Sequence, residues 1–134
     1  MSVKISVRLL LRHPQWPPAD ITTALGLQPA VAACVGDDVV TPAGIHTGHR
    51  HRHTQWTYCY EDEALNSDRY NEGLLRLAYQ LSQSEDYLRE FVASGGYCDL
   101  ILRVPTLPRS YGLKSDFLAK VASLGFDLGI ELQD

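Results

Sequence analysis

Two apolar stripes, one near each end of the chain, constrain the fold more than any other feature of the sequence. In residues 3–11 every second side chain is apolar, and most of the side chains between them are polar or charged. Residues 126–132 repeat this pattern, with Asp127, Gly129 and Glu131 between the apolar positions. Alternation with a period of two is typical of a strand that buries one face. The stripes therefore predict two strands lying side by side in one sheet, with helices over the apolar face.

Helices and further strands are predicted between the stripes. The helical segments carry apolar residues at spacings of three and four and stop at glycine. Residues 28–53 are instead interrupted by prolines and glycines, which predicts an irregular loop with a short strand at Val39 and Val40. The remaining predicted elements are strands at residues 54–60 and 97–104 and helices at residues 18–25, 70–82, 84–94 and 115–124.

A weak internal repeat of strand, proline-bearing loop, helix and Leu-Gly stop relates residues 5–27 to residues 98–126. Each half would form a βαβ-like unit. We therefore predict an α+β fold in which a mostly antiparallel or mixed four-stranded sheet has helices on one face, an elaboration of the ferredoxin-like arrangement. The chain length is that of a single globular domain spanning residues 1–134.

Composition limits the classes of function. The chain is 45% hydrophobic and 21% charged, as is usual for soluble globular proteins. Its net charge of −4 creates no field that would attract nucleic acid or an anionic membrane, so neither partner is expected. No apolar run approaches the ~18 residues of a membrane span, no signal-peptide cleavage site follows an apolar segment, and the three cysteines lack CxxC spacing. These features predict a cytoplasmic protein with reduced thiols.

Several short motifs occur along the chain in a characteristic order. They are PADITTALGLQP at residues 18–29, Gly36-Asp37, a basic stretch running into Trp56, paired helices ahead of Tyr97, and LKSDFLAKVASLGFDLGIEL at residues 113–132. This order resembles that of the DUF4279 family of bacterial proteins. The basic stretch of that family usually carries Arg, Lys and Ser, whereas here it is rich in histidine. The resemblance implies an α+β fold over nearly the whole chain and no particular activity, because the family's name records an unknown function.

The stretch HTGHRHRH at residues 46–53 is the sharpest candidate for chemistry. If it is extended, its alternating histidines project from one side, roughly 6.5–7 Å apart at each step. Neutral imidazole is a good ligand for zinc, copper or nickel, and a nearby aspartate would add an oxygen ligand. One hypothesis is therefore a metal-binding protein or a metal-dependent enzyme that holds a divalent transition metal at His46, His49, His51 and His53.

The same stretch is also a candidate anion-binding surface. Two arginines offer fork-shaped donors for phosphate or carboxylate, and histidines gain positive charge as the pH falls. The partner would be another protein with an acidic surface or a small anionic ligand. The candidate binding residues are Arg50, Arg52, His49, His51 and His53.

Other candidate sites have simpler structural interpretations. Trp56, Tyr58 and Tyr60 share one face of a predicted strand and would suit a stacking platform for single-stranded nucleic acid, but such a face is more often packed under helices. Cys59 and Cys98 lack a neighbouring signature of a nucleophile. The sequence contains no GxSxG, P-loop, dinucleotide-binding or HExxH motif.

The absence of a recognisable catalytic motif favours a non-enzymatic binding or interaction domain that uses residues 28–53 as its contact surface. A predicted proline-rich loop at residues 105–112 is a second candidate for this surface. Three alternatives remain open. The first is the metal-dependent protein described above. The second is an immunity-type protein that neutralises a toxin, an interpretation by analogy with other small bacterial proteins. The third is a homodimer formed through an open edge of the sheet.

Overall fold

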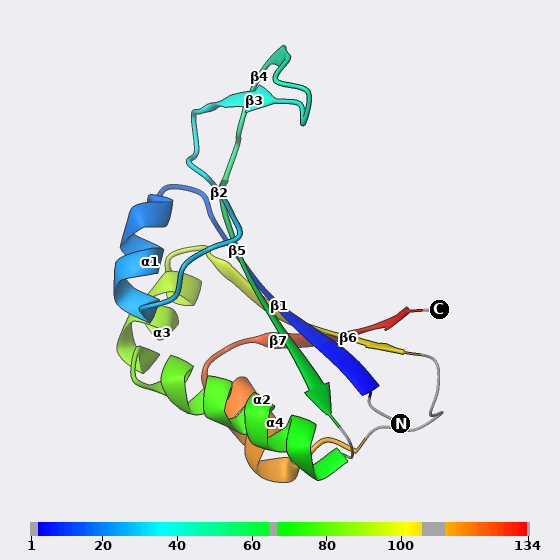
Figure 1. Ribbon diagram of the computed structural model, residues 1–134. Helices are drawn as coiled ribbons and strands as arrows, with labels where there is room; N and C mark the ends of the chain where they lie inside the picture. The colour runs from blue at the N-terminus through cyan, green and yellow to red at the C-terminus, as the bar shows by residue number, and fades with distance from the viewer. Residues whose placement is uncertain (1–2, 65–66, 106–111, 134) are drawn as a thin grey trace.

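A mixed five-stranded sheet in the order β2-β5-β1-β6-β7 is the framework of the protein (Figure 1). Strand β1 (Val3–His13) lies at its centre and pairs antiparallel with β5 (Thr54–Ala64) on one side and with β6 (Tyr97–Pro105) on the other. At the two edges, β2 (Val31–Ala33) is antiparallel to β5 and β7 (Asp127–Gln133) is parallel to β6. The computed structural model describes residues 3–64, 67–105 and 112–133 of the chain.

Within those residues, four helices cover one face of the sheet (Figure 1). Helix α1 (Pro18–Leu25) connects β1 to β2, and α4 (Ser115–Ser123) connects β6 to β7. Helices α2 (Ser67–Ser82) and α3 (Glu85–Ala93) follow each other between β5 and β6. None of the described helices combines the length and apolar character needed to cross a membrane.

The helices connect parallel strands. Strands β1 and β2 are both antiparallel to β5, so they run parallel to each other with β5 between them. In the same way β5 and β6 run parallel with β1 between them. The two β-α-β units therefore interleave, and the α4–β7 segment adds a third unit whose strands are direct neighbours.

The core lies between the helices and the alternate residues of the strands. In β6, and in β1 from Ile5 onward, every second side chain points toward the helices and is buried, because successive side chains of a strand point to opposite faces. Trp56 enters the same layer from β5. The largest fully buried side chains in the described core include Trp56, Phe91, Phe117, Leu9, Leu11, Ile21, Leu81, Leu88, Leu100 and Leu124.

The predicted α+β class, the mixed sheet and the position of the helices agree with this structure. The predicted number of strands was wrong, because the described residues form a main sheet of five strands and a second sheet of two. The two apolar stripes lie in one sheet, but they are not neighbours, since β6 separates β1 from β7. Both edges of β1 are occupied by β5 and β6, so β7 pairs with β6, to which α4 connects it.

Two local predictions also differ from the structure. Residues 28–53 are not one irregular loop, because they contain β2 and the two strands of the second sheet, β3 (Asp38–Val40) and β4 (His46–Arg50). The strand predicted at residues 54–60 is longer in the structure, because the backbone ladder of β5 with β1 continues through the acidic residues 61–63 to Ala64. Most of the predicted proline-rich loop at residues 105–112 lies outside the described residues.

The indole of Trp56 joins β5 to α1 through a part-buried hydrogen bond. Its Nε1–H donates to the hydroxyl of Thr22 over 3.0 Å, and Trp56 itself is fully buried. The Thr22 hydroxyl in turn donates to the carbonyl of Pro18. A buried donor that loses its acceptor costs more than the bond contributed, because it has already given up its contact with water.

We expect Thr22→Val to lower the free energy of unfolding by about 1–3 kcal/mol, because valine keeps the shape of threonine but leaves the indole N–H unpaired. Urea denaturation followed by tryptophan fluorescence measures the change. Thr23→Val is a matched control, since Thr23 is exposed on the same helix and its hydroxyl bonds only the carbonyl of Ala19. Equal losses in the two variants would show that the Trp56 bond is unimportant.

His13 is buried at the end of β1 and is held in its neutral form by its neighbours. The backbone N–H groups of Gln15 and Trp16 both donate to Nδ1, at 3.0 and 2.9 Å. Nδ1 must therefore carry a lone pair, which leaves the proton on Nε2 to be donated to the hydroxyl of Ser94 at 2.8 Å. Desolvation by burial lowers the pKa of His13 below its usual 6.5. The ring thus fixes the turn after β1 against the end of α3.

We expect the free energy of unfolding to fall as the pH drops below 6.5, the pKa of an exposed histidine, because the unfolded chain then binds a proton that folded His13 resists. Above that pH the contribution is complete. His13→Asn keeps an acceptor near the Nδ1 position but cannot titrate, so the dependence between about pH 5 and 7 should flatten in this variant. Chemical denaturation at several pH values tests this, with His49→Asn on the exposed strand β4 as the control that keeps the dependence of the unmodified protein.

Candidate functional site

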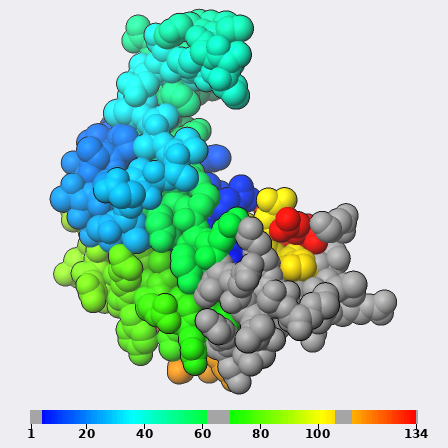
Figure 2. Space-filling view, in the orientation of Figure 1, coloured from blue at the N-terminus to red at the C-terminus, as the bar shows by residue number. Residues whose placement is uncertain are grey.

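Residues 34–53 form a projecting β-hairpin, here called the arm. It leaves the main sheet between β2 and β5 and stands clear of the helices and the rest of the sheet (Figures 1 and 2). Its strands β3 and β4 pair antiparallel with each other and with no other described strand. All five residues of β4 are exposed. A surface with this much accessible backbone and side chain is the first candidate for contact with another molecule.

Backbone hydrogen bonds close the base of the arm. The N–H of Gly36 donates to the carbonyl of His51 at 2.9 Å, and the N–H of His51 donates to the carbonyl of Asp37 at 2.8 Å. The N–H of Val35 donates to the hydroxyl of Thr54, the buried first residue of β5. The first two bonds hold the two sides of the arm together, and the third connects the arm directly to the main sheet.

A tight turn and a bulge shape the outer part of the arm. Two hydrogen bonds join Thr41 and Ile45 at the tip. The N–H of Thr41 donates to the carbonyl of Ile45, and the N–H of Ile45 donates to the hydroxyl of Thr41. The register of β3 with β4 then shifts between Asp38 and Val40. Gly48 lies opposite this shift with a φ of 80°, a left-handed conformation that glycine adopts without strain.

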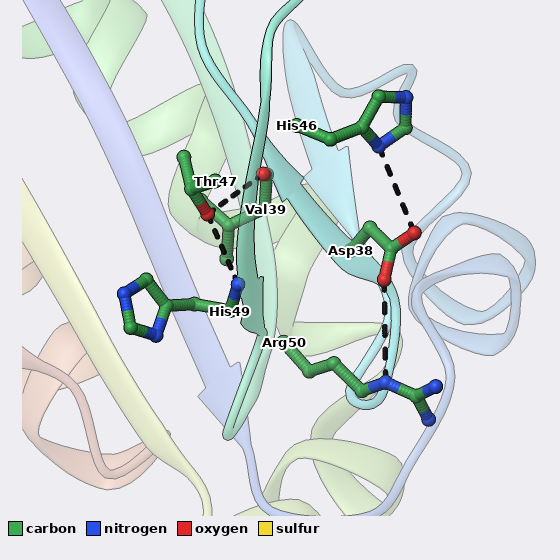
Figure 3. Close-up of polar contacts among 6 residues, drawn as sticks. All are labelled: Asp38, Val39, His46, Thr47, His49 and Arg50. Atoms are coloured by element: carbon green, nitrogen blue, oxygen red, sulfur yellow. Dashed lines mark hydrogen bonds and ion pairs between the residues drawn. The ribbon is translucent and has the colours of Figure 1, made fainter.

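Asp38 is the anionic centre of one side of the arm (Figure 3). Its carboxylate lies 3.7 Å from Nδ1 of His46 and 4.0 Å from Nε of Arg50. These side chains are highly exposed, Arg50 to 78%. Exposed ion pairs at such distances contribute only about 0–1 kcal/mol to stability, so the cations remain available to an external anion.

The candidate residues predicted from sequence are brought to one arm but not to one point. His49 lies on the opposite side of the hairpin from Asp38 and Arg50, beside Thr47, whose hydroxyl accepts from its N–H (Figure 3). Strand β4 ends at Arg50, so the alternation assumed for the histidines does not continue through His51 and His53. His51 is instead half-buried at the base of the arm.

This geometry gives no support to the metal hypothesis. Within the parts of the chain that the structure describes, no three His, Cys, Asp or Glu side chains are grouped to hold a metal ion. The predicted ligands His46, His49, His51 and His53 are dispersed because the bulge and the end of β4 interrupt the extended geometry on which the prediction depended.

Apart from Cys59, which is exposed on β5, the remaining sequence candidates take structural roles. Trp56 is buried and Tyr58 and Tyr60 pack against the core, so this strand face is not an open stacking platform. Burial, with smaller contributions from the nearby carboxylates of Asp99 and Asp127, raises the pKa of Cys98 to about 12. A buried thiol of this pKa stays protonated at neutral pH and is a poor nucleophile.

The structure also shows two surface features that sequence reasoning missed. On the sheet face away from the helices, Glu131 accepts from Arg8 at 2.6 Å and lies 3.9 Å from Arg103. On the helix side, an apolar groove of about 140 Å³ opens beside Ile130 and Leu132. The alternating pattern of residues 126–132 indicated an apolar strand face, but it gave no signal that the outer part of this face would stay uncovered.

Comparison with known proteins places the chain in a family without adding an activity. A family model described as a domain of unknown function, DUF4279, matches residues 3–134. No curated protein and no solved structure shows significant similarity to the chain. The match runs from the first residue of β1 through the end of β7, so it includes the sheet, the helices and the arm. The chain therefore belongs to the DUF4279 family.

Proposed function

We propose that this protein is a binding domain that contacts another protein through its arm, residues 34–53. The proposal rests on one observation. The arm is an exposed two-stranded ribbon that projects away from the globular part of the protein, which the main sheet and the helices form without it (Figure 1). The arm buries little apolar surface, so the core does not depend on it. A two-stranded hairpin of this length is at best marginally stable by itself, which favours a role in contact rather than in folding.

The chemistry of the arm supports an acidic partner. Arg50 and Arg52 are exposed near the base, where their guanidinium groups can take carboxylates or phosphates in a two-point geometry. His46, His49 and His53 are also exposed, and protonation of histidine would add positive charge. Asp38 contacts His46 and Arg50 only at 3.7 and 4.0 Å, so an incoming carboxylate can compete for both.

The shape of the arm supports a protein rather than a small ligand. The cationic residues are distributed over two sides of the hairpin, with His49 facing away from Arg50 (Figure 3). A small anion needs donors that converge on one point, whereas a protein surface can engage both sides and the tip of a ribbon. The exposed side chains of Val40 and Ile45 would then supply the apolar part of the interface. A toxin neutralised by this domain would be one such partner.

We also propose the ferredoxin-like description for the central part of the fold. It is supported by the order β2-β5-β1-β6 and by the two interleaved β-α-β units that these strands form. Helix α4 and strand β7 extend this unit at one edge. In this arrangement the arm is an insertion between the second and third strands of the unit.

Replacing Arg50 and Arg52 together by alanine is expected to abolish capture of the partner without unfolding the protein. The melting temperature should change by less than about 2 °C, because exposed charges contribute little to stability. The measurement is quantitative mass spectrometry of proteins retained by the immobilised domain from lysate of its source cells. Capture should also weaken as salt is raised, since exposed charges are screened.

Arg89→Ala is the matched control for this experiment. Arg89 is 61% exposed in α3 and pairs with Glu85 at 2.6 Å, so it resembles the arm arginines in exposure but lies elsewhere on the molecule. A protein retained equally by the arm variant and the control variant does not bind through the arm. If every specifically retained protein behaves in this way, the proposal is wrong.

A further inference from the structure

Strand β7 forms an edge of the main sheet that is open to pairing. Its seven residues, Asp127–Gln133, pair with β6 in an unbroken register. No strand among the described residues pairs with its other side. The strand contains no lysine, proline or bulge, which are three of the features that protect an exposed edge, and its charged side chains are those of Asp127 and Glu131. Its outer N–H and C=O groups therefore offer a regular template for another strand.

Apolar side chains continue along this edge on the side of the helices. Ile130 is 61% and Leu132 is 67% exposed, although the residues opposite them in β6, Leu102 and Val104, are buried. The same two side chains border the apolar groove of about 140 Å³. An open edge with an exposed apolar row is typical of an interaction surface. The other residues lining the groove are Ile5, Tyr70, Leu74, Leu102, Val104 and Leu113.

We propose that β7 pairs antiparallel with β7 of a second copy of the chain, about a two-fold axis that passes through Ile130. In this register Ile130 faces its own counterpart, and Leu128 faces Leu132 of the partner subunit. The apolar rows of both copies then meet on the helix side of one continuous sheet. The contact covers the exposed Ile130 and Leu132 and closes the mouth of the groove.

The charges of β7 select this register over its neighbours. About Ile130, the carboxylate of Glu131 faces Gly129 of the partner subunit, and Asp127 faces Gln133 of the partner subunit, so no two acids are opposed. A two-fold axis through Gly129 would instead place Asp127 opposite Glu131 of the partner subunit. A two-fold axis through Glu131 would place this residue opposite Glu131 of the partner subunit. Like charges directly opposite each other destabilise a strand pair. A register shifted by a single residue would place the apolar row of one copy and that of the other on opposite faces of the joined sheet.

The open face of the sheet is compatible with this pairing. Glu131 projects to that face, where Arg8 and Arg103 already compensate its charge at 2.6 and 3.9 Å. Strand β7 is thus apolar on the helix side of the sheet, and on the open face the negative charge of Glu131 is compensated by the two arginines. An acidic row without these partners would repel its own copy, as edge charges commonly do.

The two edges of the sheet favour a closed dimer over an open filament of many copies. The opposite edge of the sheet is β2, which has only three residues and leads into the arm. A contact made by the same strand in both copies is closed, so it produces a dimer and not a filament. The two arms would then lie at opposite ends of the joined sheet, an arrangement that allows bivalent binding. The dimer itself does not depend on what the arm binds.

Mass measurement by size-exclusion chromatography with light scattering tests the dimer. The chain mass is 14.9 kDa, and we expect twice that mass for the unmodified protein at about 100 µM, a concentration that reveals even weak association. Ile130→Lys should convert the protein to the monomer with unchanged circular dichroism. Ile45→Lys on the arm, at 64% exposure, and Val31→Lys on the opposite edge, at 60%, are matched controls that should stay dimeric.

A cross-linking experiment tests the register. In a Cys34→Ser, Cys59→Ser background, which leaves only the buried Cys98, Ile130→Cys should form a disulfide-linked dimer under mild oxidation, because paired residues come within disulfide range. Glu131→Cys should not, because it faces Gly129 of the partner subunit. A monomeric unmodified protein, a dimeric Ile130→Lys variant, loss of the dimer in either lysine control, or cross-linking at position 131 in place of 130 would each overturn the proposal.

Discussion

The structure depends on one strand whose two edges are both occupied. β1 pairs with β5 along its whole length and with β6 over most of it, and these two ladders fix which face of each strand meets the helices. Once Val7, Leu9 and Leu11 point to that face, the register assigns Trp56, Leu100 and Leu102 to the same layer. A shift of one residue would turn the whole apolar row of β1 toward water, so the pairing and the core stabilise each other.

Polar contacts complete this framework where elements meet. Trp56 bonds Thr22 of α1, and His13 bonds Ser94 at the end of α3. The hydroxyl of Ser84 donates to the carbonyl of Ala24 instead of capping its own helix. Each of these contacts satisfies a group that the packing has removed from water, which is why their loss costs more than their formation contributes. The arm lacks buried contacts of this kind beyond its base, and its exposed ion pairs cannot replace them.

The two proposed surfaces lie at opposite edges of the same sheet. The arm extends from the β2–β5 side, and the open edge is β7 at the other side (Figure 1). This separation lets one edge join two copies while the other contacts a partner, so the central core can stay unchanged during both events. The width of the five-stranded sheet therefore sets the distance between the arm and the β7 edge.

The sequence by itself determined the local elements, because apolar spacing, prolines and glycine stops act within short segments. It predicted α1 at residues 18–25, and the strands and other helices outside residues 28–53 to within a few residues. Only the tertiary structure decided which strands are neighbours, since pairing depends on edges contributed by distant segments. For the same reason the sequence could not predict the geometry of the histidine run, in which His46, His49 and His53 are exposed but do not form the extended row assumed for them. The bulge at Gly48 and the end of β4 at Arg50, which disperse those imidazoles, arise from pairing with β3 and not from the run itself.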